Sequence, residues 1–282
     1  MTNNSRHHAE TKNEYYELNY VKEHKSDYDQ YVKQNHYEDN DYFSTYSSYC
    51  NTHKQDYEKY TNDHKSDYDN YLKAKDQYNS ESYVKEHKSD YDNYVKQHNY
   101  GSYDEQTNCT YYCNEHKQDY DKYCKDHKDD YDHYTTAKDK YESESYVKEH
   151  KNDYDSYVKQ HNYEGNDPYT NYNYYCNDHK KDYDNYCKDN SDYDKYSTAK
   201  NEYTSQHYVQ EHKSDYDSYV KQHNYEGNDP YANYTYYTND HKDDYTKYSN
   251  DHKNDYDQSI GHDTTAMTGM TGMDMTHHDN IW

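Results

Sequence analysis

The polar and apolar positions of this chain repeat every eleven residues. The unit is clearest at Tyr83–Asn93, which reads Tyr-Val-Lys-Glu-His-Lys-Ser-Asp-Tyr-Asp-Asn, and it begins again at Tyr94. Tyrosine occupies its first and ninth places, and histidine occupies its fifth. On a helix that turns about 100° per residue, these three places lie within roughly 80° of one another and share one face. The pattern therefore predicts amphipathic helices with a stripe of phenol and imidazole rings.

A helix fits this period better than a strand because eleven residues are close to three helical turns. Tyr, Asp, Asn and Ser have modest helix propensity, so packing must supply the stability. An ion pair such as Lys88 with Asp92, on the wet face, adds only about 0.2–0.5 kcal/mol. We predict an all-α fold, an extended tandem repeat of tyrosine-faced helices arranged as hairpins or long rods, with partly disordered termini. Disorder of the whole chain is the alternative, given its charge and scarce aliphatic residues.

A second, longer period contains the short one. The unit restarts at Tyr20, Tyr83, Tyr146 and Tyr208, at spacings of 63, 63 and 62 residues. These starts define three full repeats and a truncated fourth, with boundaries at 20–82, 83–145, 146–207 and 208–258. A polar segment, 1–19, precedes the repeats, and a flexible tail rich in Met and His, 259–282, follows them.

Four segments break the helical pattern and are predicted to be loops: 38–41, 101–104, 163–169 and 225–231. In the last two, Gly165 and Gly227 are the residues expected to end a helix, and the following Asp-Pro resists its continuation. At 142–145 one residue is inserted before the unit restarts, without Gly or Pro. This insertion is either a bend between helices or a phase shift inside one long helix, and the pattern does not choose between them.

Tyrosine dominates the composition, with 50 residues among 282, beside one Phe and one Trp. The chain is 29% apolar, whereas soluble proteins are typically about 45–50% apolar. An aliphatic core is therefore excluded, and the core must be built from tyrosine rings in helix seams. Because a buried phenol needs a hydrogen-bond partner, we expect this core to be thin.

The charge balance is strongly acidic, at −25 with neutral histidine. Phosphate binding requires basic patches, so nucleic acid is not an expected partner. Protonation of all 22 histidines would bring the net charge to −3, and histidine titrates near pH 6.5 when unperturbed. An acidic granule would thus remove most of the self-repulsion. No stretch is long and apolar enough to cross a membrane, and Met1–His8 lacks the apolar core of a signal peptide, which leaves the export route open.

Conventional catalysis is not predicted. The chain has no glycine-rich phosphate loop and no nucleophile elbow, and its ionisable side chains recur in every repeat, whereas an active site needs one preorganised constellation. We therefore expect neither an enzyme nor a cofactor. Metal binding is a more serious alternative, because His87 and Asp90 offer nitrogen and oxygen ligands on one helix face. The simpler interpretation is that such side chains hydrogen-bond to tyrosine hydroxyls.

The tail offers a separate and weaker metal site. Thioether sulfurs at short spacing beside a histidine pair suit soft Cu(I). A flexible polar tail without metal is the alternative. The residues concerned are Met267, Met270, Met273, Met275, His277 and His278.

The residue set favours chemistry performed on the chain. A phenol oxidised to a catechol and then to an ortho-quinone becomes an electrophile, to which unprotonated amine, imidazole and thiolate add. The unit carries all three near its tyrosines, with Lys at places three and six, His at five and Cys at two. If tyrosine only filled the core, the tyrosines in and after the loops, such as Tyr163, Tyr169, Tyr172, Tyr174 and Tyr175, would be unexplained. The candidate nucleophiles are Cys50, Cys113, Cys124, Cys176, Cys187, His24, His87, His150 and His212.

The spacing of the cysteines limits their use as disulfides. Cys113 and Cys124 are eleven residues apart, as are Cys176 and Cys187. On a straight helix this separation is about 16 Å, too far for a disulfide bond. Thiols that react would therefore link different helices or different molecules.

The order and spacing of these residues resemble a known family. The tandem repeats of roughly 63 residues, with Tyr-Val-Lys-Glu-His-Lys-Ser-Asp-Tyr-Asp, Tyr-Cys-Lys-Asp-His-Lys-Asp-Asp-Tyr-Asp and tyrosine-rich connectors, are similar to the trematode eggshell synthesis domain of vitelline eggshell precursors in parasitic flukes. The resemblance covers about residues 20–258. It implies a structural precursor, held in secretory granules and then in the extracellular eggshell, whose tyrosines are converted to DOPA by a copper tyrosinase.

The resemblance also implies partners and reacting positions. The tyrosinase acts on the chain, and quinone tanning joins the chain to itself and to other eggshell proteins, with neither nucleic acid nor a membrane as partner. Two other functions stay open: a metal-binding or metal-storage protein, and a helical scaffold held by non-covalent packing. The implied cross-linking tyrosines are Tyr20, Tyr28, Tyr31, Tyr83, Tyr91, Tyr94, Tyr112, Tyr120, Tyr123, Tyr146, Tyr154, Tyr157, Tyr175, Tyr183, Tyr186, Tyr208, Tyr216 and Tyr219.

Overall fold

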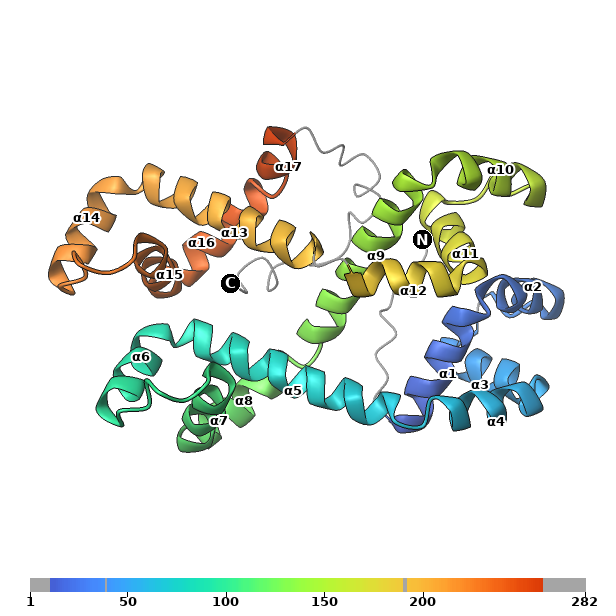
Figure 1. Cartoon of the computed structure of the whole chain (residues 1–282), viewed down its shortest axis with the longest axis horizontal. Coiled ribbons are helices and arrows are strands. Elements are labelled where there is room, and N and C mark those ends of the chain that lie inside the picture. Colours follow the sequence, from blue (N-terminus) through green and yellow to red (C-terminus); the bar gives the residue numbers. More distant parts are fainter. Residues whose placement is uncertain (1–10, 39, 190–191, 261–282) are drawn as a thin grey trace. The chain divides into compact units, whose positions relative to one another are not determined.

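Figure 1 shows the fold of the chain in a computed structural model, which describes residues 11–38, 40–189 and 192–260. Within these ranges the regular structure consists of 17 helices, and no strand is present. None of these helices is long and apolar enough to cross a membrane. The predicted all-α tandem repeat with buried tyrosine rings is confirmed.

Each repeat folds into the same succession of helices, the first of which begins before the boundary of the repeat and crosses it. Repeat 1 forms α1 (Lys12–Glu23), α2 (Lys25–Asn35), α3 (Tyr42–Thr52) and α4 (Lys54–Asp63), and repeat 2 forms α5 (Asp67–Glu86), α6 (Lys88–Gln97), α7 (Glu105–Glu115) and α8 (Lys117–Asp126). Repeat 3 forms α9 (Asp130–Glu149), α10 (Lys151–His161), α11 (Pro168–Asp178) and α12 (Lys180–Asp189). Repeat 4 forms α13 (Asp192–Glu211), α14 (Lys213–Gln222), α15 (Pro230–Asp240) and α16 (Lys242–Asp251), and α17 (Asp255–Ser259) follows it.

The longest described helices, α5, α9 and α13, have 20 residues and contain the points where the sequence pattern restarts. The insertion at 142–145 lies within α9, so it is a phase shift inside one helix and not a bend between two. The other described helices have 12 residues or fewer. In the described part of the chain the long-rod arrangement is therefore excluded, and the helices pack as hairpins.

The histidine at place five interrupts the helix in most units. His24, between α1 and α2, has φ −108° and ψ 31°. Its Nδ1 and its backbone N–H both donate to the carbonyl of Tyr20, at 2.9 and 3.1 Å. The helical ladder resumes at Tyr28, whose N–H donates to the carbonyl of His24 at 2.9 Å. A side chain that donates to the backbone in this way competes with the regular helical bonds, so each unit becomes a helix of its own.

The loops lie where the sequence predicts them, but the residue that ends each preceding helix is not glycine. A residue with left-handed backbone does so, at φ 55–57°: His36, Asn99, Asn162 and Asn224. Asn enters this region more easily than most residues. Gly165 and Gly227 stand three residues later in open space, without positive φ. An aspartate then caps the next helix by accepting its N3 backbone N–H, at Asp41, Asp104, Asp167 and Asp229.

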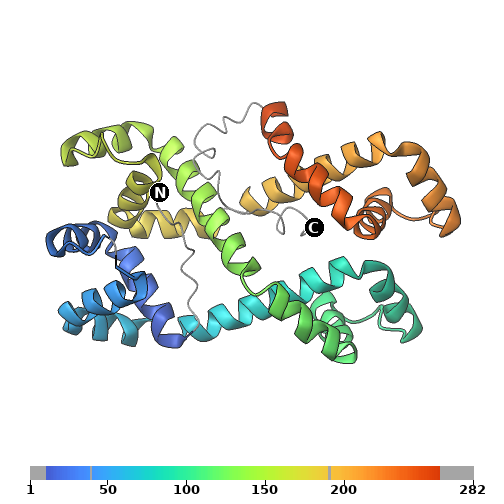
Figure 2. The same ribbon diagram turned by 180° about the vertical axis from the view of Figure 1, so that it is seen from behind.

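The core of each repeat centres on two tyrosines at place one of facing helices. In repeat 2, Tyr83 of α5 and Tyr112 of α7 are 2% and 1% exposed, with ring centroids 5.9 Å apart. Tyr120 and Tyr123 meet Tyr83 edge to face, each at 5.4 Å. Such aromatic pairs contribute about 0.5–1.5 kcal/mol beyond the area they bury. The same packing joins α1 to α3 in repeat 1 (Figure 1, Figure 2).

By their contacts the helices divide into two units, Met1–Ala74 with Thr135–Ser191 and Lys75–Tyr134 with Asp192–Trp282. The first unit holds most of repeats 1 and 3, and the second holds most of repeats 2 and 4. In the first unit α11 packs on α2, and in the second α15 packs on α6. Alternate repeats therefore meet through equivalent helices in both units.

Candidate functional site

Access to solvent separates the tyrosines into distinct groups. Four of the 50 are exposed, and each lies in a loop or in the helix that follows one: Tyr42 at 39%, Tyr103 at 51%, Tyr111 at 42% and Tyr231 at 47%. A separate enzyme can reach these phenols without unfolding the chain. The sequence analysis did not single them out as reacting positions, although the loop location of Tyr103 was a signal that could have done so.

The 18 tyrosines implied as cross-linking positions are all covered to some degree. Nine are buried, at 8% exposure or less: Tyr20, Tyr28, Tyr83, Tyr91, Tyr112, Tyr123, Tyr146, Tyr175 and Tyr208. The other nine are half-buried: Tyr31, Tyr94, Tyr120, Tyr154, Tyr157, Tyr183, Tyr186, Tyr216 and Tyr219. The stripe identified by the period is thus the core of each repeat.

The most accessible cluster of phenols lies between α6 and α7. Tyr100 is 5.5 Å from Tyr103 and 5.4 Å from Tyr111 between ring centroids, and Tyr103 is 6.1 Å from Tyr111. The exposed ring of His98 stacks on Tyr100 at 5.2 Å. The left-handed Asn99 folds the chain back so that Tyr100 N–H donates to the carbonyl of Val95 at 3.0 Å. The turn therefore holds three phenols and an imidazole side by side at the surface.

The candidate cysteine nucleophiles are withdrawn from solvent. Cys50, Cys113 and Cys176 are buried, Cys124 and Cys187 are half-buried, and all are free thiols. Place two of the unit points into the core, where cysteine takes the position that Val84 has in α5. Burial raises the pKa of Cys50, Cys113, Cys176 and Cys187 to about 12 and also raises that of Cys124. In the folded chain these side chains are thiols, whereas the nucleophile is the thiolate.

The candidate histidines are in a better position to react. His24, His87, His150 and His212 each pack against the tyrosine four residues earlier, with ring centroids 4.2–4.3 Å apart and ring planes tilted by 36–39°. Each donates from Nδ1 to that tyrosine's carbonyl at 2.9 Å. Since Nδ1 carries the proton, the lone pair of the neutral ring is on Nε2. At His24, His87 and His150 the bond that interrupts the helix thus also fixes the tautomer that leaves Nε2 as the nucleophile, whereas Nε2 of His212 lies 3.6 Å from Asp244 Oδ2.

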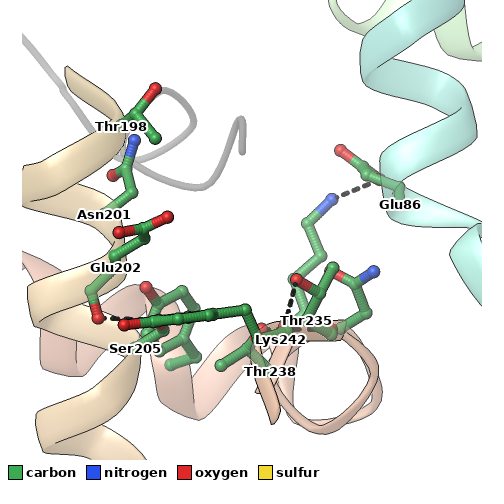
Figure 3. Close-up of a pocket in the computed structure, with 11 residues that line it drawn as sticks. Glu86, Thr198, Asn201, Glu202, Ser205, Thr235, Thr238 and Lys242 are labelled. Atoms are coloured by element: carbon green, nitrogen blue, oxygen red, sulfur yellow. Dashed lines mark hydrogen bonds and ion pairs between the residues drawn. The ribbon is translucent and has the colours of Figure 1, made fainter. Parts of the chain in front are cut away.

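The second unit contains a pocket in which some of the polar side chains have partners (Figure 3). Lys242 Nζ lies 2.7 Å from Glu86 Oε2, Ser205 Oγ donates to the carbonyl of Glu202 at 3.1 Å, and Thr238 Oγ1 donates to that of Thr235 at 3.2 Å. These pairs do not place a nucleophile beside a base. The lining residues are Glu86, Thr198, Asn201, Glu202, Ser205, Tyr231, Thr235, Thr238, Asn239, Lys242 and Tyr245.

Metal ligation was the rival chemistry. In the part of the chain that the structure describes, no group of three or more His, Cys, Asp or Glu is arranged to hold a metal ion. The Met/His segment, 267–278, lies outside the described residues. The comparisons with protein-family models, curated proteins and solved structures found no match. The likeness to the trematode eggshell repeat therefore stands on the order and spacing of this chain's own residues.

Proposed function

We propose that this chain is a non-enzymatic structural precursor of the trematode eggshell type, tanned through its tyrosines by an external copper tyrosinase. The observation that supports it most is the surface cluster of Tyr100, Tyr103 and Tyr111 beside His98. Once Tyr100 is oxidised, the imidazole of His98 already lies against its ring, with centroids 5.2 Å apart. Partners are the tyrosinase, further copies of the chain and other eggshell proteins.

The chemistry balances with dioxygen as the oxidant. The external enzyme converts one phenol and one O₂ into one ortho-quinone and one water. An unprotonated imidazole nitrogen then adds its lone pair to a ring carbon of the quinone. As the ring regains aromaticity, the two quinone oxygens become hydroxyl groups by taking up two protons, one from that carbon and one from the imidazole N–H. The product is a catechol joined to the imidazole by a carbon–nitrogen bond, so the two electrons needed to reduce the quinone come from the bond-forming lone pair.

The fold imposes an order on these reactions. Exposed phenols such as Tyr103 and Tyr111 meet the enzyme first, while Tyr83 and Tyr112 are covered in the core. Imidazole is the first available nucleophile, because the cysteine thiols are buried and protonated. Thiols join the reaction only after early adducts loosen the repeat. Tanning therefore begins in the loops and proceeds inward to the seam.

Storage before tanning follows from the charge of the chain. In an acidic secretory granule, protonated histidines would reduce the net charge from −25 towards −3 and permit dense packing. Release to neutral pH would restore the neutral imidazole that quinones require. The route of export is then granule to extracellular shell.

Tyrosinase treatment of the full chain followed by peptide mass spectrometry tests the proposal. We expect the first adducts at Tyr42, Tyr103, Tyr111 and Tyr231, with histidine as the main partner in the native chain. Tyr103→Phe should remove the adduct at position 103 and leave the one at Tyr111, while the matched core variant Tyr112→Phe should leave the early pattern unchanged. Hydroxylation without any adduct would sink cross-linking as the function, even if every tyrosine is oxidised.

A further inference from the structure

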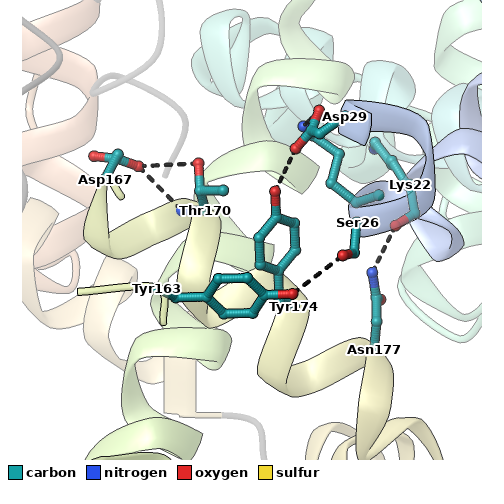
Figure 4. Close-up of polar contacts among 9 residues, drawn as sticks. Lys22, Ser26, Asp29, Tyr163, Asp167, Thr170, Tyr174 and Asn177 are labelled. Carbon is teal, nitrogen blue, oxygen red and sulfur yellow. Dashed lines mark hydrogen bonds and ion pairs between the residues drawn. The ribbon is translucent and has the colours of Figure 1, made fainter. Parts of the chain in front are cut away.

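The contact between repeats 1 and 3 includes four polar interactions. They join the loop and the helices α11 and α12 of repeat 3 to the bend between α1 and α2. Figure 4 shows the three that involve Tyr163, Tyr174 and Asn177. The Tyr174 hydroxyl donates to Asp29 Oδ2 at 2.5 Å. Asn177 Nδ2 donates to the carbonyl of Lys22 at 2.6 Å. Both bonds link residues about 150 positions apart in the sequence.

Two further interactions complete the set. The hydroxyl groups of Tyr163 and Ser26 lie 3.2 Å apart, and Lys180 Nζ lies 3.5 Å from Glu23 Oε1. We call the four side chains of repeat 3 its docking face. We call the opposing groups of repeat 1 its receiving face, which comprises the Lys22 carbonyl, Glu23, Ser26 and Asp29.

The second unit repeats the arrangement residue for residue between repeats 4 and 2. The four interactions are Tyr236 hydroxyl to Asp92 at 2.5 Å, Asn239 Nδ2 to the Lys85 carbonyl at 2.6 Å, Tyr225 hydroxyl to Ser89 at 3.0 Å and Lys242 to Glu86 at 2.7 Å. The receiving face of one repeat thus takes the docking face of the repeat two places later. A contact that recurs with the same side chains is a property of the repeat itself.

Under this rule, a docking face and a receiving face have no counterpart among the four described repeats. Repeat 2 has the docking residues Tyr100, Tyr111, Asn114 and Lys117, and repeat 4 has the receiving groups Gln210 carbonyl, Glu211, Ser214 and Asp217. Within the four described repeats neither face has a counterpart two places away. Their exposure agrees with this: Tyr111 is 42% exposed, whereas Tyr174 and Tyr236 at the equivalent position are 7% and 8% exposed.

We propose that a second copy of this chain supplies the missing counterpart. The docking face of repeat 2 in one copy seats on the receiving face of repeat 4 in another. Tyr111 donates to Asp217, Asn114 donates to the Gln210 carbonyl, and Lys117 pairs with Glu211. Because two different faces meet, the contact is heterologous and leaves one face of each kind open. Association therefore continues beyond a dimer.

The chemistry of the two faces argues for a second copy over another occupant. Glu211, Ser214 and Asp217 reproduce Glu86, Ser89 and Asp92, the side chains that receive repeat 4 within the chain. Glu211 and Ser214 are exposed, whereas Glu86 and Ser89 are half-buried under their partners. The pairing also sets a lysine against a glutamate in a chain whose net charge of −25 otherwise opposes self-association.

The first unit offers a weaker version of the same contact. The docking face of repeat 1 has Tyr37, Asn51 and Lys54, but Ser48 stands at the position of Tyr111. The receiving face of repeat 3 has Asn152 where repeats 1 and 2 have serine. A copy that docks here lacks the ring and the hydroxyl that reach the aspartate. The sequence therefore provides a natural comparison for the role of the tyrosine.

Sedimentation equilibrium of the full chain, with reductant and without tyrosinase, tests the proposal at concentrations up to roughly 1 mM. Salt near 0.15 M screens the repulsion between acidic groups of different copies beyond about 8 Å. We expect reversible association that Tyr111→Ser weakens at least about tenfold. The matched control is Tyr103→Ser, which removes an exposed tyrosine of the same loop outside the docking face and should change association less than about twofold.

Three further variants make the result decisive. Lys117→Glu and Glu211→Lys should each weaken association alone and restore it when mixed, since the mixture again pairs opposite charges. Ser48→Tyr should strengthen association by completing the docking face of repeat 1. Equal behaviour of Tyr111→Ser and Tyr103→Ser, or a monomer throughout even with Ser48→Tyr, would overturn the proposal. Neither outcome bears on tanning, because no oxidant is present in these measurements.

Discussion

Tyr83 and Tyr111 carry the same phenol and differ in what covers it. Tyr83 is 2% exposed between α5 and α7, whereas Tyr111 is 42% exposed on the outer side of α7. A covered phenol contributes packing energy and stays protonated, and an exposed one is available to an enzyme or to another chain. At the scale of the residue, the exposed fraction of a tyrosine decides whether it stabilises the core or is available for reaction. The eleven-residue period by itself does not predict that exposed fraction.

Raising the pH is expected to unfold the chain over a defined window. Burial raises the pKa of Tyr20, Tyr83 and Tyr146 to about 12, whereas an unfolded tyrosine ionises near 10. The folded state therefore keeps protons that the unfolded state has lost, so this stabilisation is present below about pH 10 and disappears towards pH 12. Cys50 and Cys176, with pKa raised to about 12, act in the same sense from about pH 8.5 upward.

An alkaline titration followed by circular dichroism and tyrosinate absorbance checks this expectation. The buried tyrosines, such as Tyr20, Tyr83 and Tyr146, should ionise together with the loss of helix. Ionisation of nearly all tyrosines near pH 10 with helix content unchanged would contradict the burial of the rings.

At the scale of the element, two side-chain devices divide the chain into short helices. The Nδ1–H of histidine donates a hydrogen bond to the carbonyl four residues earlier, as His87 does to Tyr83 at 2.9 Å. The left-handed residue before each loop reverses the chain, as Asn162 does after α10 with φ 56°. The aspartate of the next cap then starts the following helix. Both devices use side-chain chemistry that a hydrophobic pattern does not contain.

Substitutions at Asn162 and Gly165 separate the two possible helix-ending residues. Asn162→Ala removes the polar side chain that lets asparagine adopt φ 56°. This substitution should lower the free energy of unfolding by about 1 kcal/mol. Gly165→Ala meets open space and needs no positive φ, so it should be neutral or stabilise by about 0.4–1 kcal/mol. Urea denaturation of the full chain measures both. If Gly165→Ala destabilised the chain more than Asn162→Ala, glycine would be the residue that ends the helix.

At the scale of the whole molecule, the sequence predicts the fold class and the positions of the loops. The period sets tyrosine on one helix face, and Asp-Pro at 167–168 and 229–230 marks where a new helix begins. The contacts between alternate repeats were not predicted, because they join residues such as Asp29 and Tyr174 that are 145 positions apart. Every repeat presents similar faces. The period therefore identifies the faces that can pair but does not identify which two repeats pair. The exposed tyrosines were not predicted for the same reason, because whether a tyrosine is covered depends on which repeats pair.

Acidification should condense the chain without melting its helices. The chain carries −25 at neutral pH, and protonation of its 22 histidines would leave −3, so the repulsion between copies falls steeply across the range where histidine titrates. The helix interruptions survive this change, because His24 and His87 already donate from Nδ1 and the added proton enters at Nε2.

Turbidity and circular dichroism of a concentrated solution, taken from about pH 7.5 to about pH 5, measure the two halves of this expectation. Salt at about 1 M at the higher pH is the matched control, since screening to about 3 Å should reproduce part of the condensation without protonation. Unchanged solubility in acid would remove histidine as the switch for dense storage. Loss of helix in acid would show that the charged ring is not tolerated at the interruptions, and that the neutral imidazole is needed for the fold as well as for the reaction with quinones.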